Sequence, residues 1–204
     1  MSKKSAINLP YGHRVFICGS SKTTNPESEY YRKELPELIR QEMDKRMYRG
    51  EIFIVGDAPG IDTQVQDYLH SREYDRVAVY AMEEARYLAN SKWKTIKITI
   101  HPMSYEDYNF YTFIVPEKGT REWYELTDLF LCSNADSAIA ILIYGDSMAT
   151  RKNIESLKRK GIPIIVYELF PDEKQDFCYS CERYPKTREE LYLDYYSRLL
   201  DEQK

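Results

Sequence analysis

The sequence predicts an α/β protein of the Rossmann type, with a doubly wound, mainly parallel sheet and flanking helices. Short apolar, β-rich runs alternate along the chain with segments of helical periodicity. A polar turn that contains glycine follows three of these runs. The run at 138–144 is apolar throughout, which is typical of a central parallel strand that is covered on both faces.

The first half of the chain predicts strands and helices in alternation. Asn25 and Pro26 resemble an N-cap and a first-turn proline, and Pro36 has to kink or restart the helix that they open. In chain order, we expect a strand at 14–18, this helix up to Gly50, a strand at 51–55, a helix with the face Ile61, Val65 and Leu69, a strand at 76–80, a helix at 83–91 and an extra strand at 95–100.

The second half continues the alternation after an aromatic, polar segment at 102–118, which is expected to be a long binding loop or short helices. The whole chain, 1–204, is interpreted as one domain, with a core at 14–167 and a C-terminal extension at 168–204. The elements expected here are a helix at 120–132, the strand at 138–144, a helix at 153–160 that Gly161 ends, a strand at 162–167, a loop at 170–185 and a terminal helix at 187–200.

The composition excludes several classes of protein. With 204 residues, 43% hydrophobic residues and 30% charged residues, the chain is typical of a globular domain. A formal net charge of -4 argues against general nucleic-acid binding, although it leaves room for a local anion site. No apolar run approaches 18 residues and no secretory signal opens the chain, so we expect no membrane partner and a cytoplasmic location with reduced cysteines.

The three turns are expected to lie along one edge of the sheet, where ligands bind in doubly wound folds. The first turn is Gly19-Ser20-Ser21, whose hydroxyl and backbone N–H groups can hold phosphate oxygens or simply form a turn. The second runs from Gly56 through Asp57 and Gly60 to Asp62. Asp62 either caps the following helix or accepts hydrogen bonds from a ribose or base.

The third turn, Gly145 to Arg151, follows the most apolar strand. Ser147 and Thr150 offer hydroxyl groups near a helix N-terminus, where they can cap the helix or bind a ligand, and Arg151 can hold a phosphate. The carboxylates Asp57, Asp62 and Asp146 share this predicted edge; they can serve as an acid–base pair, bind Mg²⁺ together with a nucleotide, or act only in turns and caps.

No metal site is predicted, because Cys178 and Cys181 form a single CxxC pair without a second close pair of ligands. The three histidines lie far apart in the sequence and show no metal-binding spacing.

The turns resemble those of the SLOG superfamily, which includes the LOG phosphoribohydrolases and DprA-like proteins. Residues 14–21 are similar to its opening strand and loop, and 55–62 resemble the Gly-Asp-Ala-x-Gly-x-Asp turn of its YspA/YpsA-like branch. Gly119-Thr-Arg121 resembles the start of its arginine-bearing helix, 147–150 its Ser-x-Gly-Thr turn, and 161–164 the segment after it. The resemblance implies a Rossmann-like nucleotide-binding protein, in which Arg121 contacts phosphate or is an ordinary surface arginine.

Two departures weaken the hydrolytic chemistry of the LOG enzymes here. Ala149 stands where the turn has its second glycine, and Asn153 stands where those enzymes carry a glutamate. Because an amide is neither a general acid nor a general base, binding without turnover is favoured.

The leading interpretation is therefore binding or sensing of a nucleotide-derived small molecule. One alternative is a nucleotide N-glycosidic hydrolase or transferase that uses Asp62 or Asp57 as its catalytic carboxylate. Another is a protein-interaction module built on 102–118 and 187–200. The oligomeric state stays open between a monomer and a homo-oligomer. The expected ligand-binding residues are Gly19, Ser20, Ser21, Gly56, Asp57, Gly60, Asp62, Arg121, Gly145, Ser147, Thr150 and Arg151.

Overall fold

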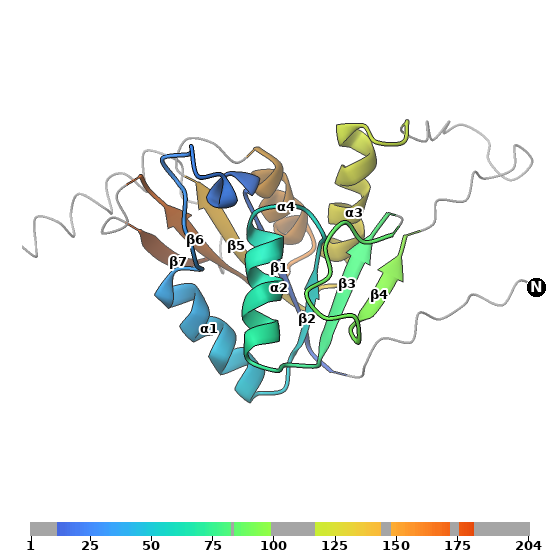
Figure 1. The fold of residues 1–204 in the computed structure, drawn as a ribbon, viewed down its shortest axis with the longest axis horizontal. Coiled ribbons are helices and arrows are strands. Elements are labelled where there is room, and N and C mark those ends of the chain that lie inside the picture. Colours follow the sequence, from blue (N-terminus) through green and yellow to red (C-terminus); the bar gives the residue numbers. More distant parts are fainter. Residues whose placement is uncertain (1–11, 83, 99–116, 144–147, 172–175, 182–204) are drawn as a thin grey trace, which may run out of the picture.

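The protein folds around one seven-stranded sheet with the order β4-β3-β2-β1-β5-β6-β7. A computed structural model describes residues 12–82, 84–98, 117–143, 148–171 and 176–181. Six strands are parallel, and β7 runs antiparallel to β6 at one edge (Figure 1). The predicted α/β fold with a mainly parallel sheet is therefore confirmed.

The described elements follow the expected alternation for most of the chain. Their bounds are β1 (Arg14–Gly19), the 3-10 helix η1 (Ser21–Thr24), α1 (Glu37–Tyr48), β2 (Ile52–Val55), α2 (Ile61–Ser71), β3 (Val77–Ala81), β4 (Lys94–Lys97), α3 (Arg121–Asn134), β5 (Ser137–Ile143), α4 (Met148–Arg159), β6 (Ile164–Leu169) and β7 (Phe177–Cys181).

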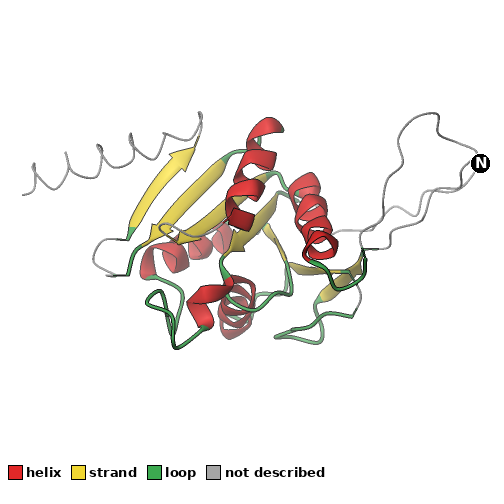
Figure 2. Ribbon diagram, turned by 90° about the horizontal axis from the view of Figure 1, so that it is seen from above, coloured by secondary structure: helices red, strands yellow, loops and turns green. Residues whose placement is uncertain are grey.

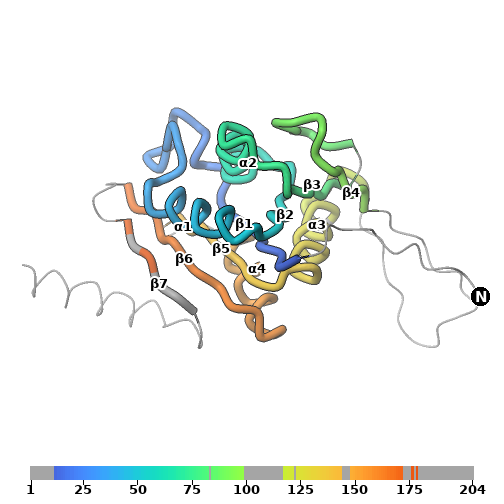
Figure 3. The backbone as a smooth tube through the Cα atoms, turned by 90° about the horizontal axis from the view of Figure 1, so that it is seen from below, coloured from blue at the N-terminus to red at the C-terminus, as the bar shows by residue number. Residues whose placement is uncertain are grey.

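The helices cover the sheet in two layers, α1 and α2 on one face and α3 and α4 on the other (Figures 2 and 3). Alternate residues of each strand enter the two cores, as the period of two requires. In β5, Ala138 and Ala140 face the layer of α3 and α4, whereas Ile139 and Ile141 face that of α1 and α2. All seven residues of β5 are buried, so the prediction of a central strand is confirmed.

The helix predicted from Asn25 is wrong in its first part, because α1 begins only at Glu37. Side chains and distant carbonyls hold the backbone N–H groups of the preceding segment. Asn25 Oδ1 accepts from the N–H of Glu27, and the Thr23 carbonyl accepts from the N–H of Arg32. Such local hydrogen bonds compete with a helical ladder, and Pro36 prevents its continuation.

The helix predicted at 83–91 is also wrong, since its described part, 84–91, forms bends and turns. Two backbone N–H groups there are held by side chains of other elements. Asp57 Oδ2 accepts from the N–H of Arg86 at 2.9 Å, and Gln66 Oε1 accepts from the N–H of Ala89 at 3.2 Å. The segment is thus fixed to the turn after β2 and to α2.

The loop predicted at 170–185 contains β7, so this interpretation is wrong as well. Asp176 Oδ1 accepts from the N–H of Phe170 at 3.0 Å, which holds the two ends of the β6–β7 connection together. The strand expected near 95–100 is β4, which pairs in parallel with β3 at the other edge of the sheet. The segments 99–116 and 182–204, with most of the aromatic loop and the predicted terminal helix, lie outside the described residues.

Candidate functional site

The order in which the chain adds strands to the sheet reverses between β1 and β5. From β1 it proceeds through β2 and β3 to β4, whereas β5 leads to β6 on the other side of β1. In open α/β sheets, ligands bind outside the carboxyl ends of the strands at such a switch point. Gly19 ends β1, and Ser20 and Ser21 follow it at this place.

The first two glycine-containing turns pack directly against each other. The Ile61 N–H at the start of α2 donates to the Ser20 carbonyl at 3.3 Å. Gly60 has φ 101°, and a Cβ atom there would lie 2.5 Å from the Ser20 oxygen. Only glycine fits this position without displacing the backbone of the first turn. The structure therefore brings the two predicted turns together.

The Asp62 carboxyl group folds back over the end of β2. Its Oδ2 accepts a hydrogen bond from the Ala58 N–H at 3.1 Å, and a Cβ atom on Gly56 would overlap this carboxyl group. Asp62 lies in the first turn of α2, and the N-cap position belongs to Gly60. The carboxyl group thus supports the turn, and the exposure of the residue as a whole is intermediate.

Asp57, buried to 5% exposure, carries the second carboxylate of this turn. Its Oδ1 accepts from Arg86 Nη2 at 2.7 Å, in addition to the backbone bond at Oδ2. The Arg86 guanidinium group also lies 4.4 Å from the centre of the Tyr124 ring on α3. One cation therefore neutralises Asp57, stacks on an aromatic ring, and remains partly exposed at the edge.

Two carboxyl groups at this edge have strongly raised pKa values. Burial raises the pKa of Asp62 to about 8; the charges of Asp128 and Asp57 add to the shift, and the Ala58 N–H opposes it. Burial also raises the pKa of Asp128 on α3 to about 6, against a hydrogen bond with Asn153. Near neutral pH, Asp62 is therefore mostly a neutral acid beside a mostly ionised Asp128.

Asn153, which stands at the place of the LOG glutamate, is buried in α4. Its side chain interacts with Asp128 and with Cys18, and its carbonyl lies 3.9 Å from Cys132 Sγ. Burial, followed by the negative charge of Asp128, raises the pKa of the Cys18 thiol. Both cysteines are free and buried, so their thiols are unreactive packing groups.

The structure describes only the last part of the third turn. Gly145, Asp146 and Ser147 lie outside the described residues. Thr150 is buried in the first turn of α4, and Arg151 Nη2 lies 3.8 Å from Glu168 of β6. Arg121 pairs with Glu125 on its own helix at 3.0 Å, as an ordinary surface arginine does. Each of these two arginines is therefore paired with a glutamate.

Within the described ranges, no group of three or more His, Cys, Asp or Glu residues is arranged to hold a metal ion. Cys178 of β7 is a free thiol. None of the helices that the structure describes combines the length and the hydropathy required to cross a bilayer.

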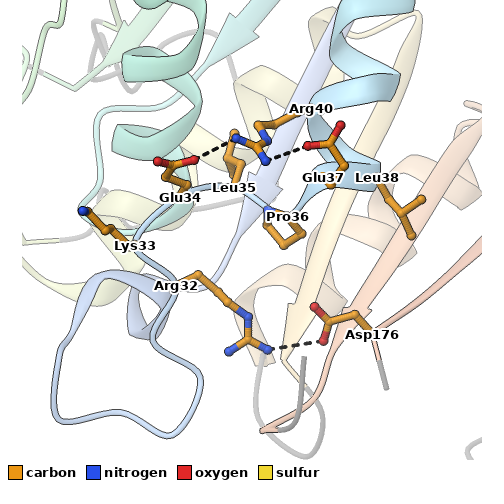
Figure 4. Close-up of a pocket in the computed structure, with 9 residues that line it drawn as sticks. All are labelled: Arg32, Lys33, Glu34, Leu35, Pro36, Glu37, Leu38, Arg40 and Asp176. Carbon is orange, nitrogen blue, oxygen red and sulfur yellow. Dashed lines mark hydrogen bonds and ion pairs between the residues drawn. The ribbon is translucent and has the colours of Figure 1, made fainter. Parts of the chain in front are cut away.

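A cavity of about 480 Å³ lies at the N-terminus of α1 (Figure 4). Most of its charged side chains form ion pairs with one another. Arg40 pairs with Glu34 at 2.8 Å and with Glu37 at 2.6 Å, and Arg32 pairs with Asp176 at 3.3 Å. The cavity is lined by Arg32, Lys33, Glu34, Leu35, Pro36, Glu37, Leu38, Arg40 and Asp176.

Sequence reasoning missed three residues that shape the edge, namely Arg86, Tyr124 and Asp128. Asp128 had a signal, because it is a single carboxylate within the otherwise apolar stretch around Leu126 and Leu131 of a helix. Arg86 carried none, because its importance comes from contacts with residues far away in the sequence.

The chain was compared with protein-family models, with curated proteins and with solved structures, and none of the three comparisons gives a match. The site is therefore interpreted from its own residues.

Proposed function

We propose that the protein is a SLOG-like binding or sensing protein for a nucleotide-derived small molecule at the carboxyl edge of β1 and β2. The observation that carries the proposal is the gathering of Asp62, Asp128 and Arg86 beside the switch point. A ribose or base needs hydrogen-bond partners of both kinds, and a neutral carboxyl group both donates and accepts. Asp62 is such a group at neutral pH.

Arg86 supplies the positive charge for the phosphate in this proposal. Its guanidinium group is held by Asp57 and by the Tyr124 ring, so it is positioned before any ligand arrives. It remains partly exposed, and an arginine can share its donors between a carboxylate and a phosphate. Ser20 and Ser21 follow the end of β1 at the same edge of the sheet. Their hydroxyl and N–H groups can bind further phosphate oxygens.

The test is thermal unfolding of the protein with a panel of nucleotides, nucleotide sugars and cyclic nucleotides. A ligand at 100 times its dissociation constant stabilises the fold by about 2.7 kcal/mol. Arg86→Gln should weaken the binding of any ligand that shifts the midpoint. Arg159→Gln, at an exposed position of α4, is the matched control and should leave it unchanged. A panel that shifts nothing would refute the proposal.

A second candidate function is hydrolysis of the N-glycosidic bond of the bound nucleotide. The observation that favours it is the unequal pair of carboxyl groups, with pKa values of about 8 for Asp62 and about 6 for Asp128. In this reaction Asp62 gives its proton to the departing base, and Asp128 accepts a proton from the water that attacks the sugar carbon.

Analysis of the ligand after incubation separates the two functions. Release of free base and sugar phosphate by the wild-type protein, and its loss in Asp62→Asn with binding retained, supports hydrolysis. Recovery of the ligand unchanged supports binding alone. Mg²⁺ should be present in one half of the assays, since it can accompany a nucleotide phosphate.

A further inference from the structure

The outer surface of α3 and α4 combines an apolar stripe with basic side chains. Leu129 and Phe130 of α3 are 50% and 40% exposed, and Leu126 is partly buried beside them. On an α-helix, positions 126, 129 and 130 share one face. Leu126 packs against the core that Leu131 and Cys132 enter, so Leu129 and Phe130 form the exposed part of this face.

Lys152 of α4 and Lys160, which directly follows α4, border this stripe at both ends. Lys152 Nζ donates to Glu125 Oε1 at 2.8 Å, and Lys160 Nζ donates to Ser133 Oγ at 2.7 Å. Glu125, Leu129 and Ser133 form one row at a spacing of four residues, so Leu129 lies midway between the two ammonium groups. On α3, the eight-residue spacing from Glu125 to Ser133 corresponds to about 12 Å.

The charge of this surface differs from that of the whole protein. Residues 121–134 and 148–160 together carry six basic and four acidic residues, a net charge of +2, whereas the formal net charge of the chain is -4. The two helices lie side by side on the same face of the sheet (Figures 1 and 3). A second copy of this surface would bring the same excess of basic over acidic residues, so self-association through this face is disfavoured.

We propose that the α3–α4 surface binds an amphipathic helix of a partner protein that carries two carboxylates about two turns apart with a leucine-like side chain between them. The apolar side chain packs against Leu129 and Phe130, and the carboxylates meet Lys152 and Lys160. Apolar contact supplies the affinity, and the two charge pairs set the position and direction of the bound helix. This binding is separate from the ligand site at the edge of the sheet.

The experiment uses the full chain and two synthetic peptides of about 17 residues. Both are alanine-based and stapled on the far side to hold the helix, since free helices of this length are marginal. One peptide carries Glu-x-x-x-Leu-x-x-x-Glu, and the other has Lys at both Glu positions. Fluorescence anisotropy at low salt should show binding of the Glu peptide that is at least about tenfold tighter than binding of the Lys peptide.

Variants assign the binding to the proposed surface. Leu129→Ala should weaken the Glu peptide by about tenfold, as expected for a central apolar contact. Lys160→Glu should shift the preference toward the Lys peptide. Lys152→Gln/Lys160→Gln, which adds no acid beside Glu125, should remove most of the preference. Tyr48→Ala, at a 94% exposed aromatic residue of α1, is the control and should change nothing.

Three results would overturn the proposal. The first is equal or absent binding of the two peptides by the wild-type protein. The second is a preference for the Glu peptide that survives both lysine substitutions in variants that melt at the wild-type temperature. The third is displacement of the Glu peptide by duplex DNA or by phosphatidylglycerol vesicles at lower concentrations than unlabelled Glu peptide requires, which would identify an anionic polymer or membrane surface as the occupant.

Discussion

Arg86 holds Asp57 from two sides, with its guanidinium Nη2 at 2.7 Å from Oδ1 and its backbone N–H at 2.9 Å from Oδ2. The pair joins the turn after β2 to the connection between β3 and β4. Because Asp57 is buried, it depends on this cation for compensation of its charge.

Arg86→Met should destabilise the protein by about 2–3 kcal/mol in urea unfolding, since it leaves a buried carboxylate without its cation. The expected loss is smaller than that for breaking a fully buried ion pair, because the Arg86 side chain is partly exposed. Adding Asp57→Asn should restore part of the stability, giving a coupling energy in the double-mutant cycle. Purely additive effects of the two substitutions would contradict this account.

Gly60→Ala should cost more than about 3 kcal/mol, because the added Cβ would meet the backbone of Ser20 and Ser21 at a backbone conformation that glycine alone adopts readily. Gly161→Ala is the matched control. It also has positive φ, at 69°, but a Cβ there meets no atom within 4 Å. The control should lose only about 1 kcal/mol in the same chemical unfolding measurement. Similar losses for the two variants would show that contact between the turns is unimportant.

Asp62→Asn should gain stability relative to the wild-type protein as the pH rises. The folded pKa of Asp62, about 8, lies above its ordinary value of 3.8, so the folded state binds the extra proton between these pH values. Wild-type stability therefore falls as the pH rises through this range. The asparagine variant lacks this carboxyl group, so its stability does not fall for this reason. The difference in unfolding free energy, measured from pH 5 to pH 9, should grow by a few kcal/mol and level off above about pH 8.

Asp136→Asn provides a control of opposite sign. The hydrogen bond from Arg14 holds the pKa of Asp136 below its usual value, so the wild-type carboxylate stabilises the fold at neutral pH and loses this contribution in acid. This variant should be less stable than the wild-type protein at pH 7, with a difference that shrinks as the pH falls through the acid range. A pH-independent difference for both variants would contradict the assignment of these carboxyl groups.

Arg46→Met should cost about 3–5 kcal/mol, because Arg46 is buried and compensates two glutamates at once. Its side chain, 8% exposed, pairs with Glu42 at 2.9 Å and with Glu51 at 3.0 Å, and donates to Ser137 Oγ at 2.8 Å. Arg49→Met removes an exposed arginine that also contacts Glu51, and should cost less than about 1 kcal/mol. Thermal and urea unfolding of both variants provide the comparison.

The fold class and the meeting of the first two glycine-containing turns could be predicted from the amino-acid sequence. Strands buried on both faces are encoded as continuous apolar runs such as 138–144, and these runs need no knowledge of their neighbours to be recognised. The turns at Gly19 and at Gly56 to Asp62 were predicted to meet at one edge, and they do, because parallel strands bring their carboxyl ends together.

The polar groups that meet at that edge could not be predicted from the sequence, because they come from segments far apart in the chain. Asp57 and Arg86 are 29 residues apart, and Asp62 and Asp128 come from helices on opposite faces of the sheet. The same long-range bonds kept 84–91 from forming a helix, because Asp57 and Gln66 hold its N–H groups. Local sequence encodes helical periodicity and burial, but the pKa of Asp62 depends on neighbours that the order of the strands places beside it.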